Sequence, residues 1–111
     1  MVSKETFRQM ALNFEEAIEQ PHFEKASFRV SKKIFATLDT IKERAVVKLS
    51  EIDQSVFMAF DSSIVYPATG AWGKQGWTIL ELKTVKKAML QDALALSYCN
   101  VAPKRLSEKY R

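Results

Sequence analysis

The chain has 111 residues, 47% of them hydrophobic, and a formal net charge of +4 at pH 7. A chain of this length can bury one core, so we expect a single domain over residues 1–111. No apolar run reaches the roughly 18 residues of a membrane-spanning helix, and the N-terminus lacks a signal peptide's apolar core. The single cysteine excludes an internal disulfide, which suits a reducing compartment. Together these features lead us to expect a cytoplasmic protein that is a monomer and does not associate with a membrane.

The charge is unevenly distributed along the chain. Residues 1–61 contain 9 Lys or Arg and 10 Asp or Glu, whereas residues 62–111 contain 8 and 3. A basic half can attract phosphate groups through its summed electrostatic field. Mildly basic proteins without a nucleic-acid role are also common, so the charge alone leaves the function open.

Helical periodicity opens the chain. Apolar residues recur at a spacing of three to four, which predicts an amphipathic helix over residues 3–19. Either Ser3 caps this helix, or Thr6 forms a capping box with Gln9 one turn later. Pro21 marks its end, because the residue before a proline avoids the α region.

Residues 28–38 are central to the predicted fold. Two runs rich in β-branched and aromatic residues flank Ser31-Lys32, a pattern that indicates a β-hairpin. A two-residue turn pairs Phe28 with Phe35, whereas a three-residue loop changes this register. Lys32 is unfavourable at the positive φ of a type I′ turn, so the sequence leaves both registers open.

The remaining elements complete an α+β pattern. We expect a strand at 45–49, followed by a helix at 50–59 that Ser50 caps. Strands at 64–67 and 77–82 are joined by a glycine-rich hairpin loop. A helix at 84–101 that Thr84 caps comes next, and a basic tail that frays ends the chain. The predicted order is α-β-β-β-α-β-β-α. This order favours a two-layer fold with a five-stranded antiparallel sheet, on which the last helix packs through Met89, Ala93 and Leu96.

No catalytic or metal site is indicated by the sequence. His22 and Cys99 lack the spacing of a nucleophile pair or of metal ligands. Gly70, Gly73 and Gly76 match neither a dinucleotide fingerprint nor a Walker loop, and we expect them to supply positive φ angles in a tight loop. We therefore expect a non-enzymatic protein without cofactor or metal.

Aromatic and basic side chains occur together in the glycine-rich loop. Trp72 lies two residues from Lys74, so its ring can stack on a base while the ammonium group contacts a phosphate. In the alternative, Trp72 folds back onto the sheet as part of the core. Trp77 begins a strand and is expected to pack in the sheet.

Other cations are candidates for the same role. Lys32-Lys33 lies at the hairpin tip and Lys104-Arg105 follows the last helix; each pair either contacts phosphate or only increases solubility. Lys48 lies inside an apolar strand. We expect it to face solvent or a partly polar groove, with Asp39 or Glu81 as its companion.

The chain resembles the MmcQ/YjbR family over nearly its whole length. The resemblance is carried by PHFEK (21–25), SFRV (27–30), KIFATL (33–38), AVVKL (45–49), YP (66–67), GAWGKQGWT (70–78), SY (97–98) and VAPK (101–104). Many relatives have glycine where this chain has Lys32. The resemblance implies a two-layer α/β fold similar to type III secretion chaperones and frataxin-like proteins. It also implies DNA binding through two β-hairpin wings, here the Ser31-Lys32 hairpin and the loop from Gly70 to Gly76.

We therefore expect a small DNA-binding protein whose binding is weak, electrostatic and indifferent to sequence. The candidate contacts are Lys32, Lys33, Lys48, Trp72, Lys74, Lys104 and Arg105. The alternative is a protein–protein interaction or chaperone-like module with no nucleic-acid role. A continuous basic face that includes both loop tips favours the first function, and a large exposed apolar patch favours the second.

Overall fold

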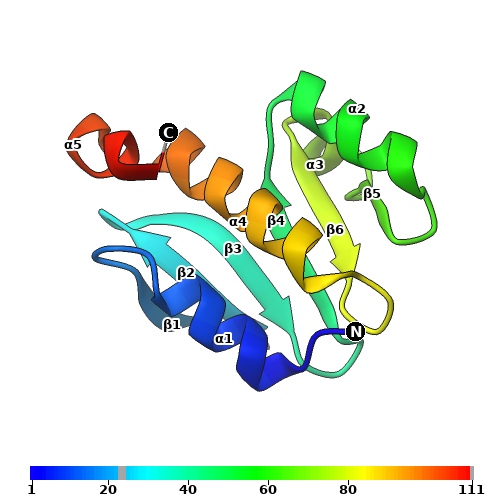
Figure 1. Ribbon diagram of the computed structural model, residues 1–111, viewed down its shortest axis with the longest axis horizontal. Helices are drawn as coiled ribbons and strands as arrows, with labels where there is room; N and C mark the ends of the chain where they lie inside the picture. Colours follow the sequence, from blue (N-terminus) through cyan, green and yellow to red (C-terminus); the bar gives the residue numbers. More distant parts are fainter. Residues whose placement is uncertain (23–24, 111) are drawn as a thin grey trace.

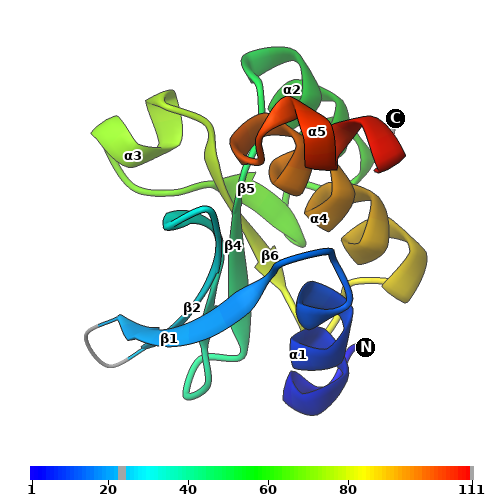
Figure 2. The same ribbon diagram turned by 90° about the vertical axis from the view of Figure 1, so that its left-hand side faces the viewer.

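The computed structural model describes residues 1–22 and 25–110, in which a six-stranded antiparallel sheet packs against helices on one face (Figures 1 and 2). The spatial strand order is β1-β2-β3-β4-β6-β5. The strands are β1 (Ile18–His22), β2 (Lys25–Val30), β3 (Lys33–Asp39), β4 (Arg44–Lys48), β5 (Val65–Pro67) and β6 (Trp77–Glu81). The helices are α1 (Lys4–Leu12), α2 (Glu51–Phe60), α3 (Ala71–Lys74), α4 (Lys87–Val101), α5 (Lys104–Ser107) and the 3₁₀ helix η1 (Glu108–Tyr110).

The α+β class and the antiparallel sheet are confirmed, but the predicted count of five strands and the predicted element order are wrong. The additional strand is β1, which lies in the segment predicted as the end of the first helix. That helix stops at Leu12, because Asn13 caps it and the acidic residues that follow are unfavourable at a helix C-terminus. Glu16 then turns the chain with φ of 62°, and Pro21 is tolerated because β1 is an edge strand.

The predicted hairpin forms with a two-residue turn. Ser31 and Lys32 have φ angles of 49° and 69°, so Lys32 adopts the positive φ of such a turn although it is not glycine. A register shift next to Phe28 places it opposite Ala36, so its predicted pairing with Phe35 is wrong. In the motif PHFEK, Phe23 and Glu24 lie outside the described residues.

The core between sheet and helices is rich in aromatic rings. Phe7 meets Phe28 edge to face at 5.4 Å between ring centroids. The fully buried Tyr98 stacks on Phe14 and donates a hydrogen bond of 2.7 Å to a backbone carbonyl, and burial raises the pKa of Tyr98 to about 12. Tyr110 completes this cluster from η1. The tail predicted to fray is therefore folded onto the core.

The last long helix packs on the core through a face that overlaps with the predicted one. It begins after Lys86 rather than at Thr84, whose backbone N–H donates to the Glu81 carbonyl in a turn. Ala93 is buried as predicted, but Met89 and Leu96 are only partly buried. The buried side chains of α4 are Leu90, Ala93, Leu94, Ser97 and Tyr98.

The segments that flank β5 and β6 contain more regular secondary structure than the sequence predicts. Ser50 caps α2 as predicted, accepting from the Asp53 N–H at 3.1 Å. The segment predicted as a hairpin loop contains the short helix α3.

Across the described residues, no helix has the length and apolarity required to cross a bilayer.

Candidate functional site

A groove lies on the face of the sheet that the helices α1 and α4 leave uncovered. Side chains alternate along each strand, so residues between the core positions of β3, β4 and β6 point to this face. Figure 2 shows α3 on the same side of the sheet, away from α1 and α4, with β1 reaching to that side below it. The groove has a volume of about 510 Å³; its lining is His22, Lys25, Ile34, Thr37, Asp39, Lys42, Arg44, Val46, Ala68, Thr69, Trp72, Trp77 and Ile79. We refer to it as the sheet-face groove.

The glycine-rich segment holds α3 close to the sheet. A Cβ atom on Gly73 would lie 2.1 Å from the Ala68 carbonyl oxygen, and one on Gly76 would lie 2.0 Å from the Leu49 carbonyl oxygen. Gly76 also has φ of 106°, and Gly70 has φ of 66°. Positive φ therefore explains Gly70 and Gly76, as predicted, whereas Gly73 is needed for close backbone packing.

Helix α2 fastens α3 to β6 through one side chain. The Gln54 amide donates to Thr78 Oγ1 at 2.9 Å and to the Gly73 carbonyl at 3.2 Å, and it lies 3.4 Å from the Trp77 carbonyl. Thr78 in turn donates to the Gly76 carbonyl at 2.9 Å. These contacts fix the backbone that carries both tryptophans of the groove.

The two tryptophans differ in exposure, as the sequence predicts. Trp72 on α3 is 63% exposed, whereas Trp77 on β6 is half-buried. The Lys48 Nζ lies 5.7 Å from the centroid of the Trp77 ring, within the range of a cation–π contact. The predicted companions of Lys48, Asp39 and Glu81, make no ion pair with it in the described part of the chain. The indole is the companion instead.

The carboxylates at the groove have other partners. Glu81 accepts from Arg44 Nε at 2.9 Å and from the Tyr66 hydroxyl. The Asp39 Oδ1 accepts the backbone N–H groups of Lys42 (3.0 Å) and Ile41 (3.1 Å). The hydrogen bond from the Lys42 N–H, and to a lesser extent that from the Ile41 N–H, lowers the pKa of Asp39, so this carboxylate is ionised at neutral pH.

The end of the groove near Asp39 is nevertheless cationic. Among the described lining residues it has the three cations Lys25, Lys42 and Arg44 and the carboxylate of Asp39, while Glu81, outside the lining, pairs with Arg44. Along β4, Arg44 and Lys48 lie four residues apart, which corresponds to about 13 Å of strand. The apolar side chains of Val46 and Ile79 therefore lie between this cationic end and the Lys48–Trp77 contact.

The structure separates the residues predicted from the sequence into three groups. Trp72 lines the groove, Lys48 contacts the groove-lining Trp77, and Lys74 is exposed on α3 beside Trp72. Lys32 and Lys33 are exposed at the β2–β3 tip, and neither lines the groove.

The third group lies on α5. Arg105 binds both carboxylate oxygens of Glu16, at 2.8 and 3.2 Å, and Lys104 lies 3.8 Å from Glu108. These ion pairs offset the two positive charges that were expected to face a ligand. The acidic run after α1 and the basic tail therefore serve first to hold the C-terminus in place.

Several residues of the groove were not identified as site residues from the sequence: Lys25, Lys42, Arg44, Val46, Trp77 and Ile79. The available signal was the period-two alternation of β4 and β6, which assigns Arg44, Val46 and Lys48 to one face. The sequence does not show that this face is concave. The concavity depends on β1 and α3, and neither was predicted.

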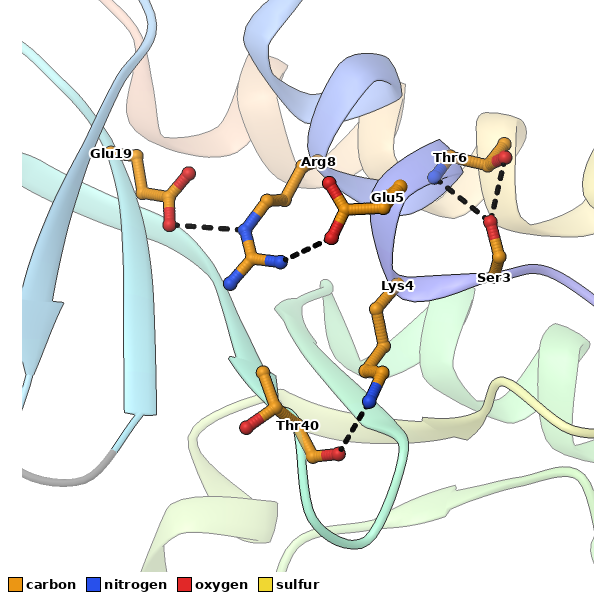
Figure 3. A network of polar contacts seen from close by, with 7 residues as sticks. All are labelled: Ser3, Lys4, Glu5, Thr6, Arg8, Glu19 and Thr40. Carbon is orange, nitrogen blue, oxygen red and sulfur yellow. Dashed lines mark hydrogen bonds and ion pairs between the residues drawn. The ribbon is translucent and has the colours of Figure 1, made fainter.

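A second hollow, of about 540 Å³, lies between α1 and β1. Arg8, which lines it, contacts Glu5 at 3.1 Å and Glu19 at 3.2 Å, while the Lys4 Nζ donates to the Thr40 carbonyl at 3.4 Å (Figure 3). This network ties α1 to the edge of the sheet. The sheet-face groove, with its exposed indole, is the stronger candidate for a site.

The outer face of α2 also exposes apolar side chains. Ile52, Val56 and Phe60 follow one another at a spacing of four and are 77%, 51% and 71% exposed. We refer to these residues as the α2 stripe.

Within residues 1–22 and 25–110, no three His, Cys, Asp or Glu side chains are grouped so that they could hold a metal ion.

Comparison with known proteins gives the family. The YjbR family model matches residues 12–100, a segment that contains every residue lining the sheet-face groove. The chain belongs to the YjbR family. This confirms the resemblance stated from the sequence, while the matched segment leaves out Lys104 and Arg105.

A solved structure supports the YjbR assignment. The crystal structure of the Deinococcus radiodurans protein DR2400, with the family domain DUF419, is similar with a TM-score of 0.82. It covers 99% of this chain and 88% of its own, at 19% sequence identity, so the likeness shows the fold. The search of curated proteins gave no match.

Proposed function

We propose that this YjbR-family protein binds DNA through the open face of its sheet, weakly and without sequence preference. The observation that carries the proposal is Trp72, 63% exposed on α3 beside a groove with a cationic end. An exposed indole offers a stacking surface for bases, and neighbouring ammonium and guanidinium groups neutralise phosphates. The proposed activity is binding by a monomer, without catalysis.

The cations contribute unequally to the proposed binding. Lys25 and Lys42 line the groove, Lys48 contacts the ring of the groove-lining Trp77, and Lys74 is exposed on α3, two residues from Trp72. Arg44 is partly neutralised by Glu81, and Lys104 and Arg105 are offset by their own carboxylates. Lys32 and Lys33 extend the basic surface at the hairpin tip. Phosphate contacts from these four lysines predict a dissociation constant of about micromolar or weaker.

The test is a titration of a labelled duplex of about 16 base pairs at several salt concentrations. Four phosphate contacts give a log–log salt slope of about −3.6. Changing Lys42→Gln and Lys74→Gln together should reduce the slope by about 2. The matched control changes Lys86→Gln and Lys87→Gln, two exposed lysines at the start of α4 on the helical side, and should leave it unchanged. No binding, or an equal effect of both pairs, would contradict the proposal.

One observation favours the alternative, a protein-interaction module. The α2 stripe exposes three large apolar side chains in line on one helix, a pattern that suits docking into an apolar partner surface. A chain that binds neither duplex nor single strand would make this the preferred function.

A further inference from the structure

We propose that the sheet-face groove holds unpaired bases, so that single-stranded nucleic acid binds more tightly than a duplex of the same length. This inference rests on the proposed function and specifies the substrate class of that site.

The first argument is the shape and lining of the groove. Its volume of about 510 Å³ is that of a small-molecule pocket, and a double helix can only lie across its mouth. Two indoles, Trp72 and Trp77, lie along it with the aliphatic side chains of Ile34, Val46 and Ile79. Such flat apolar surfaces bind base faces, which neighbouring bases cover within a duplex and which a single strand exposes.

The second argument is the distribution of charge around this lining. Lys25, Lys42 and Arg44 line one end of the groove, and Lys48, which contacts the ring of the groove-lining Trp77, lies about 13 Å from Arg44 along β4. The floor between them is apolar. An extended strand that follows β4 can therefore place phosphates near Arg44 and near Lys48 while its bases reach the indoles.

The third argument concerns the state of the site without a ligand. Trp72 remains 63% exposed although Gln54 and the close packing at Gly73 fix the helix that carries it. Because the backbone of this helix is already held in place, stacking on Trp72 orders no additional backbone, which favours affinity. Asp39 and the Arg44–Glu81 pair reduce the positive potential, so stacking has to supply much of the binding.

The test uses intrinsic fluorescence, because Trp72 and Trp77 are the only two tryptophans in the chain. The full chain is titrated with an oligothymidylate of about ten nucleotides and with a blunt duplex of the same length at low salt. We expect the single strand to quench the fluorescence and to bind about tenfold more tightly than the duplex.

Two variants and one control locate the effect. Stacking of a base is worth about 1–3 kcal/mol, so Trp72→Ala should weaken single-strand binding roughly five- to hundredfold, followed with a labelled oligonucleotide. The exposed side chain makes the expected change in melting temperature small. Trp72→Phe keeps a flat ring and should retain most of the affinity. Phe60→Ala removes a ring that is 71% exposed outside the groove and should change neither affinity.

The outcomes separate this inference from the proposed function. Duplex binding as tight as single-strand binding, or single-strand affinity unchanged in Trp72→Ala, overturns the base-holding groove and leaves DNA binding by the open face intact. Equal losses in Trp72→Ala and Phe60→Ala also overturn it. Absence of binding to either oligonucleotide overturns both.

Discussion

Replacing Gln54 by alanine tests how α3, and with it Trp72, is held over the groove. The Gln54 side-chain nitrogen carries two hydrogens and has its shortest contacts with Thr78 Oγ1 (2.9 Å) and the Gly73 carbonyl (3.2 Å). Gly73 belongs to α3 and Thr78 to β6, so one side chain on α2 connects three elements. Gln54→Ala removes this connection and leaves the buried Thr78 hydroxyl oxygen without its donor.

The expected magnitude follows from these contacts. Each hydrogen bond contributes about 0.5–1.5 kcal/mol to stability, so two amount to about 1–3 kcal/mol. Alanine has the higher helix propensity and returns a few tenths of a kcal/mol, which leaves a loss of about 1–2.5 kcal/mol. For a chain of this size, 1 kcal/mol corresponds to about 4 °C in melting temperature. Gln54→Ala should therefore lower the melting temperature by about 4–10 °C.

The assay combines thermal unfolding with acrylamide quenching of the tryptophans. Loosened attachment of α3 should increase the quenching of the folded variant at room temperature. The matched control is Ser55→Ala, the next residue on α2, whose exposed side chain should shift the melting temperature by less than about 2 °C. A shift of that small size in Gln54→Ala, with unchanged quenching, would refute the idea that this amide supports α3.

Two further predictions concern the ends of the same framework. Gly73→Ala places a Cβ atom 2.1 Å from the Ala68 carbonyl oxygen, and such overpacking costs about 1–3 kcal/mol. The melting temperature should therefore fall by about 4–12 °C, and the NMR amide shifts of α3 should change. Unchanged amide shifts would contradict the close packing. The hydrogen bond from Arg105 lowers the pKa of Glu16 below its usual 4.5, so the stability from this pair is present above pH 4.5 and is lost as the pH falls through the lowered pKa. Glu16→Gln should therefore lessen the loss of melting temperature on acidification below pH 4.5, and an identical acid profile would contradict this role.

The part of the fold that depends on local pattern could be predicted from the sequence. Alternating β-branched and aromatic residues identified β2, β3, β4, β5 and β6, and the Ser50 cap identified the start of α2. The start of α1 after Ser3 could be predicted, but its end could not, since apolar spacing continues through Ile18 while the helix stops at Leu12. The local signals for the end, Asn13 and the acidic residues after it, are supported by tertiary ion pairs of Glu15 and Glu16 with Lys109 and Arg105 from the far end of the chain.

The candidate site could be predicted only in part for a related reason. Trp72 and Lys74 were identified because aromatic and basic residues adjoin glycines in the sequence, and Trp72 is exposed. Lys25 in β2 and the pair Lys42 and Arg44 at the β3–β4 turn line one groove only because β2, β3 and β4 are neighbours in the sheet. Lys104 and Arg105 were chosen by charge alone, and the structure shows that their charges are paired.

The fold alone does not determine the chemistry of the groove. A structure with 19% identity still reaches a TM-score of 0.82, so most side chains can change while this backbone persists. Core packing at positions such as Tyr98 restricts the face that α1 and α4 cover, whereas the groove side chains lie outside that core. Nucleic-acid binding therefore has to be decided for this chain from Trp72, Trp77 and the cations beside them. The two tryptophans make that decision measurable, because any strand that occupies the groove must change their fluorescence.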